Sequence, residues 1–155
     1  MDKPTKTAKQ LLDMKKQAGF FSVPANSTVK AALEVLSEKN IGAVLVMDGA
    51  KLVGIFSERD YARKGELQGR TAESTAIREV MTLSVAWVAP DRTVDECRRI
   101  MGEMRIRHLP VLDGAKVIGV LSSKDILDEI IAEDEKLIRD LETERLLMTT
   151  TAGNY

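Results

Sequence analysis

The apolar and polar positions of the chain predict short strands and amphipathic helices. Apolar residues recur at helical spacing after Thr28, and the pattern then changes to two apolar runs, Ala43–Met47 and Leu52–Phe56. Asp48-Gly49 lies between these runs and is typical of the turn of a β-hairpin. The predicted unit is a short strand, a helix, a hairpin of two strands and a closing helix.

The same unit returns later in the chain. Val23–Ala62 aligns with Val88–Leu127 without a gap, at a constant offset of 65 positions. Brief first strands are expected around Phe20–Val23 and Val85–Val88, and the polar segment Gly65–Ser74 is the expected linker. A duplication of this kind predicts two halves that pack against each other. The identical pairs include Thr28/Thr93, Val46/Val111, Asp48/Asp113, Gly49/Gly114, Gly54/Gly119, Ser57/Ser122 and Asp60/Asp125.

The segments outside the two units are also predicted to be helical. A similar lead-in precedes each unit, Thr7–Leu12 and Thr75–Val80, and each predicts a short helix entering its unit. After Asp125 the last helix is expected to run on with an incomplete apolar stripe. Because this helix is so polar, it is expected to pack on the module or on a partner subunit. The tail Met148–Tyr155 has the composition of a frayed end. The stripe consists of Leu127, Ile130, Ile131, Leu137, Ile138 and Leu141.

Each unit ends in the same motif, in which an apolar run leads to a serine and an aspartate follows three residues later. Ser57 and Ser122 are placed to be helix N-caps, and Asp60 and Asp125 can complete a capping box. Capping alone explains these residues. A helix N-terminus also offers free N–H groups and a partial positive charge that suit a phosphate.

Composition narrows the classes of function. The 155 residues carry a net charge of −1 with few aromatic residues, so a nucleic-acid surface has little support. No apolar run reaches membrane-spanning length and no signal segment is visible near Met1, which makes a cytoplasmic protein the expectation. Cys97 is the single cysteine and His108 the single histidine, so an intramolecular disulfide and a histidine metal cluster are excluded. No nucleophile–base pair or Walker loop is present, and the chain is not expected to be an enzyme.

The duplicated unit, the Asp-Gly hairpins and the Gly-apolar-apolar-Ser-x-x-Asp endings resemble a tandem pair of CBS domains, the modules named after cystathionine β-synthase. The resemblance covers about Thr7 to Ile131 and includes Glu79-Val80-Met81-Thr82 and Arg107-His108-Leu109-Pro110-Val111. It implies an α+β fold of two β-α-β-β-α repeats, 7–66 and 75–131, packed as a pseudo-two-fold pair. Residues 132–155 then form a C-terminal helix and a flexible tail.

The family resemblance also implies a ligand. Such pairs often bind AMP, ADP or ATP, and sometimes NAD(H) or S-adenosylmethionine, in clefts between the repeats, and they usually form homodimers. The motif aspartates correspond to Asp60 and Asp125, which would take the ribose hydroxyls because an ionised carboxylate is purely an acceptor. Ser57 and Ser122 would lie near the phosphate. Arg59 and Lys124 fall where the family sometimes places a phosphate-binding cation, although a solvated first-turn residue is the simpler reading of each.

The run before the second hairpin differs between the copies. Arg107 and His108 stand where the first copy has Gly42 and Ala43, and in the family such residues reach the phosphates. The asymmetry predicts that one site binds better, and Asp60 with Arg107 and His108 is the favoured combination. The adenine slot that the family resemblance implies is formed by Met81, Thr82, Val85, Trp87, Phe20 and Val23, and Pro110 of the second hairpin is a further candidate. Trp87 would either stack on the base or cover the junction between the halves.

Two leading functions remain open from the sequence, and a minor enzyme activity on a bound nucleotide ranks last. One is an adenine-nucleotide sensor whose two repeats change their packing on binding and are read by an unidentified effector protein. The other is a ligand-free dimerisation or scaffold module, in which the serines and aspartates are only caps. The sensor function requires a ligand that binds one packing of the two repeats more tightly than the other, because a ligand that binds both equally does not shift the equilibrium between them.

Overall fold

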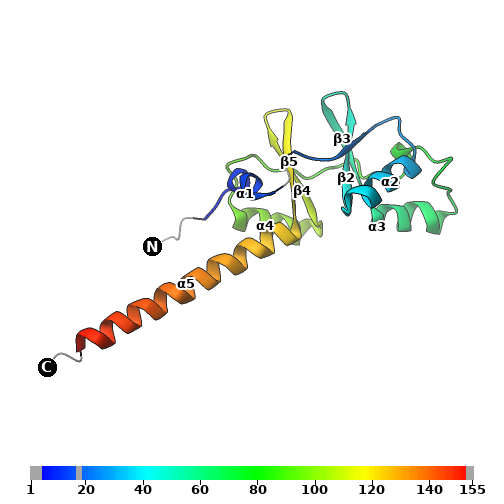
Figure 1. Cartoon of the computed structure of the whole chain (residues 1–155). Coiled ribbons are helices and arrows are strands. Elements are labelled where there is room, and N and C mark those ends of the chain that lie inside the picture. The colour runs from blue at the N-terminus through cyan, green and yellow to red at the C-terminus, as the bar shows by residue number, and fades with distance from the viewer. Residues whose placement is uncertain (1–4, 17–18, 153–155) are drawn as a thin grey trace.

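The computed structural model describes residues 5–16 and 19–152 and has an α+β architecture built from two similar halves (Figure 1). The first half contains, in chain order, β1 (Ser22–Pro24), the helix α2 (Val29–Lys39), β2 (Ala43–Asp48), β3 (Lys51–Ser57) and the single turn α3 (Glu58–Asp60). The second half contains α4 (Val94–Met104), β4 (His108–Asp113), β5 (Lys116–Ser122) and α5 (Ser123–Ala152). The helix α1, Ala8–Met14, precedes both.

The two hairpins have the same register, as the repeat predicts. Ala43 pairs with Ser57 in the first hairpin, and His108 pairs with Ser122 in the second. Each hairpin has an irregularity at the matching place, after Val46 and after Val111. Gly49 and Gly114 hold positive φ angles of 60° and 62° in the turns, a conformation that glycine adopts without steric cost.

The short strand predicted around Val85–Val88 is reduced to one bridge. In the first half, β1 runs parallel to β2, and the Leu45 N–H donates to the Phe21 carbonyl at 3.2 Å. Pro110 occupies the position that corresponds to Leu45 and has no N–H to donate. Only Val88 keeps its bonds there, to the Pro110 carbonyl at 3.0 Å and from the Leu112 N–H at 2.9 Å.

Two further expectations need correction. The predicted linker Gly65–Ser74 begins inside helical structure, because a π-helical turn at Tyr61–Gly65 and a 3₁₀ turn at Glu66–Gln68 extend α3. The predicted frayed tail is helical as far as Ala152, and 153–155 lie outside the described residues. No glycine or proline lies between Gly119 and Gly153, so the sequence contains no strong helix breaker that would end α5 earlier.

Each lead-in packs against the opposite half. Ala8 and Leu11 of α1 belong to the buried cluster around Val94 and Cys97, whereas Ile77 and Val80 belong to the cluster around Val29 and Phe56. The two lead-ins are thus exchanged between the halves. The second lead-in is only a 3₁₀ turn, Ile77–Glu79, where the sequence predicted a short helix.

Backbone bridges fix the register of this exchange. Thr7 pairs with Thr93, and Ala76 pairs with Thr28. Ala76 is therefore the structural counterpart of Thr7. The similar sequences Thr7-Ala8 and Thr75-Ala76 would instead match Thr7 with Thr75, one position earlier. In this register Leu12 and Met81 become equivalent residues, and they pack over Gly119 and Gly54.

Alanine at Gly54 or at Gly119 is expected to destabilise the fold by about 1–3 kcal/mol, because it overpacks this contact. A Cβ at Gly54 would lie 2.5 Å from the Met81 sulfur and 3.2 Å from the Thr82 carbonyl oxygen. A Cβ at Gly119 would lie 2.6 Å from a methyl carbon of Leu12. Urea unfolding of the purified variants measures the change.

Gly102 supplies the matched control for these substitutions. It is an exposed position of α4 where a Cβ meets nothing within 4 Å. Gly102→Ala is expected to be neutral or to stabilise by up to about 1 kcal/mol through helix propensity. Equal effects at Gly54 and Gly102 would contradict the close packing of the exchanged lead-ins.

No helix in the described ranges 5–16 and 19–152 combines the length and the apolar character that a membrane span requires.

Candidate ligand-binding site

The two Ser-x-x-Asp motifs adopt the predicted capping box. The Ser57 Oγ accepts from the Asp60 N–H at 3.2 Å, and the Asp60 Oδ2 accepts from the Ser57 N–H at 3.0 Å. The second motif repeats this geometry between Ser122 and Asp125 at 3.1 and 2.8 Å. The capping function is therefore present in both copies, and each aspartate is held at a strand-to-helix junction with a fixed side-chain direction.

The surroundings of Asp60 define the first site. The hydroxyl of Thr82 donates to the Asp60 Oδ1 at 3.3 Å, and the Lys64 ammonium lies 3.5 Å from the same oxygen. Thr82 is brought there by two backbone hydrogen bonds to Ile55, of 2.8 and 3.1 Å. The exchanged lead-in thus places Met81 and Thr82 beside the first motif. We call Ser57, Asp60, Met81 and Thr82 the Asp60 site.

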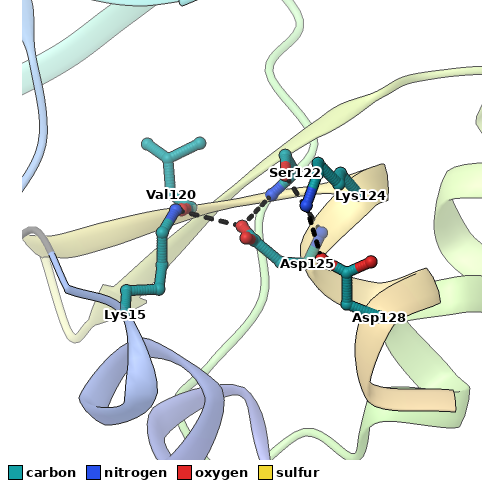
Figure 2. A network of polar contacts seen from close by, with 6 residues as sticks. All are labelled: Lys15, Val120, Ser122, Lys124, Asp125 and Asp128. Atoms are coloured by element: carbon teal, nitrogen blue, oxygen red, sulfur yellow. Dashed lines mark hydrogen bonds and ion pairs between the residues drawn. The ribbon is translucent and has the colours of Figure 1, made fainter. Parts of the chain in front are cut away.

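The surroundings of Asp125 define a second, different site. The Lys15 ammonium reaches from the end of α1 and donates to the Asp125 Oδ2 at 3.0 Å and to the Val120 carbonyl at 2.9 Å (Figure 2). Lys15 is two-thirds buried there, so the ion pair is partly shielded from water. We call Ser122, Asp125, Lys15 and Val120 the Asp125 site.

The ionised form of Asp125 is favoured in this setting. Partial burial would raise the pKa of the Asp125 carboxyl, but the Ser122 backbone N–H and the Lys15 ammonium outweigh burial and hold this pKa below its ordinary value. The negative charge of Asp125 is therefore kept and is already matched by a cation of the same chain.

His108 lies where the two halves meet. A Cβ built on Gly42 would be 3.3 Å from the His108 ring, and the Gly42 carbonyl accepts from the Glu58 N–H at the start of α3. Burial lowers the pKa of the His108 imidazole, the charges of Lys15 and Arg107 lower it further, and Asp125 opposes them. The His108 imidazole thus feels the charges of Lys15 and Asp125 from the Asp125 site, while its ring lies beside Gly42 of the half that carries Asp60. Arg107 is exposed.

The two first-turn cations differ in their surroundings. Lys124 is paired with Asp128 along its own helix at 2.6 Å. Arg59 is exposed, and its side chain forms no ion pair or hydrogen bond in the described part of the chain. The Lys124 contact, visible in Figure 2, is an exposed i,i+4 pair of the kind that contributes little to stability.

The residues expected around the adenine fall into three groups. Thr82 contacts Asp60, and Met81 is buried and packs over Gly54. Trp87 is 52% exposed, and Phe20 and Val85 are half-buried. The side chains of Val23 and Pro110 are buried, so these two residues would meet a ligand through their backbone.

Lys15 is the residue that sequence reasoning missed. Its position beside Asp125 depends on the exchange of lead-ins, which brings residues 110 positions apart into contact. Nothing in the local pattern around Lys15 signals this, and the neighbouring Lys16 looks the same in the sequence. The thiol of Cys97 is buried and its pKa is raised to about 11, chiefly by burial, as suits a core residue.

Comparisons with known proteins agree with this architecture. The profile of the CBS domain matches the chain twice, at residues 8–66 and 77–132. The CBS domain-containing protein CBSX3, mitochondrial, of Arabidopsis thaliana is 32% identical over 121 residues, which cover 75% of this chain and 59% of the relative. The chain therefore spans somewhat more than half of that relative's length.

Solved structures show the same fold. A putative signal-transduction protein with CBS domains from Burkholderia ambifaria is 44% identical, with a TM-score of 0.79 over 82% of this chain and 95% of that one. The CBS domain pair of protein MJ0100, solved in complex with 5-methylthioadenosine and S-adenosyl-L-methionine, is 27% identical, with a TM-score of 0.72 over 84% and 99% of the two chains. The predicted α+β fold of two tandem repeats is confirmed, and the chain belongs to the CBS domain family.

Proposed function

We propose that this chain is a regulatory module that binds an adenosine-containing ligand, of the AMP, ATP or NAD(H) class, between its two CBS repeats. The observation that carries the proposal is the Asp60 carboxylate, which is held at a helix N-terminus and accepts a hydroxyl hydrogen bond from Thr82 at 3.3 Å. A ribose offers the same kind of donor. The adenosine ligands of the MJ0100 pair support the ligand class.

The Asp60 site is the proposed principal site. A ribose that binds there replaces a long bond from a neutral hydroxyl and an exposed contact to Lys64. At the Asp125 site it would have to replace the shorter, more buried bonds of Lys15 to a carboxylate and a carbonyl. The Lys15 bond to Asp125 is shorter, more buried and joins two charged groups, so the second exchange costs more.

The proposed role is regulatory rather than catalytic. The ligand shifts the packing of the two repeats, and an effector protein or the second subunit of a homodimer responds to that shift. This requires tighter binding to one packing arrangement than to the other. In this proposal the residues of the Asp60 site hold the nucleoside. The cytoplasm is the proposed location.

A thermal-shift panel tests the proposal. Wild-type protein free of bound nucleotide is heated with AMP, ADP, ATP, NAD, NADH, S-adenosylmethionine or 5-methylthioadenosine, and with UMP as a control. At least one adenosine ligand is expected to raise the melting temperature with concentration, with a stabilisation of about 2.7 kcal/mol at one hundred times its Kd. The proposal is rejected if none of them does so.

A scaffold module is the second candidate, and one observation favours it. Both capping boxes are complete without any ligand, so the serines and aspartates already have a structural purpose. In that case none of the adenosine compounds shifts the melting temperature, and Asp60→Asn changes only the stability.

A further inference from the structure

The outer part of α5 extends away from the two halves (Figure 1). Its first turns are anchored, since Ile126 is buried and the buried Glu129 pairs with Lys6 at 2.6 Å. With 30 residues the helix is about 45 Å long, at 1.5 Å per residue. A helix that leaves its module over such a length needs a partner for any apolar face it carries.

That face is a regular heptad stripe. Leu127, Ile131, Ile138, Leu141 and Met148 are between 46% and 72% exposed, and together with Asp134 and Arg145 they recur in alternating steps of four and three. This spacing produces the seam of a coiled coil. Among the described residues nothing covers the seam, and neither the Asp134 nor the Arg145 side chain forms an ion pair or hydrogen bond along its own helix.

The two charges make the seam complementary to itself in one arrangement. Two copies of α5 that run antiparallel about an axis between Arg139 and Asp140 place Asp134 opposite Arg145 of the second copy. In the same register Ile138 faces Leu141 and Ile131 faces Met148. Every seam residue thus meets a suitable counterpart, which is the property of an interface between identical chains related by a two-fold axis.

We infer that α5 is a homodimerisation element that pairs antiparallel with α5 of a second copy of this chain. A parallel pair in register would set Asp134 against Asp134 and Arg145 against Arg145, which places like charges inside the seam. Charged seam residues of this kind specify register and orientation. The length also fits, because the antiparallel register brings Ala152 of one copy beside Leu127 of the other, so the pairing extends to the turns of α5 that are anchored on its module.

One rim contact opposes the pairing. Glu135 of each copy flanks Glu142 of the other in this register, and the repulsion is moderated by solvent and salt. Glu135→Lys converts this repulsion into attraction at two symmetric places. In a parallel pair Glu135 would flank the apolar Ile130, so the substitution would not strengthen the pair.

Disulfide trapping in the full-length chain tests the orientation. In a Cys97→Ala background, the double variant Ile131→Cys with Met148→Cys is expected to give covalent dimers on mild oxidation, whereas each single variant gives none. A parallel pair would trap the single variants instead. Trapping of either single variant, or failure of the double variant to trap while it remains folded by circular dichroism, overturns the inference.

Charge reversal tests the register, and the rate of disulfide trapping in the Ile131→Cys, Met148→Cys double variant is the quantity measured. Asp134→Arg is expected to lower the rate of trapping at least fivefold, and the addition of Arg145→Asp is expected to restore it. Glu135→Lys should raise the rate. Asp140→Arg, which makes the same change of charge on the opposite side of α5, is the matched control and should have little effect. A reversal that the second substitution does not restore contradicts the assigned register.

Discussion

Asp60→Asn is expected to remove most of the affinity for an adenosine ligand at the Asp60 site. The carboxylate can accept two hydroxyl bonds at once, whereas an amide offers one acceptor oxygen. Each hydrogen bond to a charged group contributes about 1.5–3 kcal/mol, so the affinity should fall between about tenfold and more than a hundredfold. Isothermal titration calorimetry with the ligand found in the thermal-shift panel measures the change.

Two variants control for the structural role of Asp60. Ser57→Ala removes the hydroxyl that accepts from the Asp60 N–H and donates to the Asp60 Oδ2 at 3.1 Å, but it keeps the carboxylate and its backbone bond, so it should lower stability more than affinity. Asp125→Asn repeats the chemistry of the substitution at the other repeat and should leave the affinity of the Asp60 site nearly unchanged. If Asp60→Asn binds as wild type does, the ribose contact assigned to this carboxylate is wrong.

Lys15→Met is expected to raise the affinity of the Asp125 site for adenosine by about tenfold to a hundredfold, since it removes a charge-assisted competitor for the carboxylate. The methionine keeps the apolar stem of the side chain and loses only the ammonium. Calorimetry should then show a second binding event per chain. Adenosine is the appropriate ligand for this measurement because it lacks a phosphate that the lost cation could attract.

Lys64→Met and Lys16→Met provide the matched controls. Lys64 is the corresponding contact of Asp60, but it is longer at 3.5 Å and more exposed, so its loss should change the affinity of the Asp60 site by less than about threefold. Lys16 is the adjacent exposed lysine and tests the effect of net charge alone. An unchanged Asp125 site in Lys15→Met would show that Lys15 does not compete with the ligand.

Local chemistry explains what the sequence could predict. Asp48-Gly49 and Asp113-Gly114 determine the hairpin turns, and Ser57 and Ser122 determine the helix starts, because each signal acts through neighbouring backbone atoms. The repetition of these signals carries the resemblance to tandem CBS domains, and that resemblance implied the fold class.

The remaining features depend on contacts between distant residues. The loss of the second short strand results from Pro110, whose effect is visible only when Leu45 is known to donate to Phe21. The contact between Lys15 and Asp125 results from the packing of α1 on the second half. The pattern along the chain indicates that a segment is helical, but it does not indicate which half the segment covers.

The exchange of lead-ins has a consequence for how the chain can be divided. A cut between Thr71 and Ser74 would leave two fragments, each of which lacks part of its own buried cluster and carries a part of the other's. Neither fragment is then expected to be a stable unit by itself, although a mixture of the two can complement. The pair of repeats should accordingly melt in one cooperative step. The boundary between the two sequence repeats therefore does not separate two independent folding units.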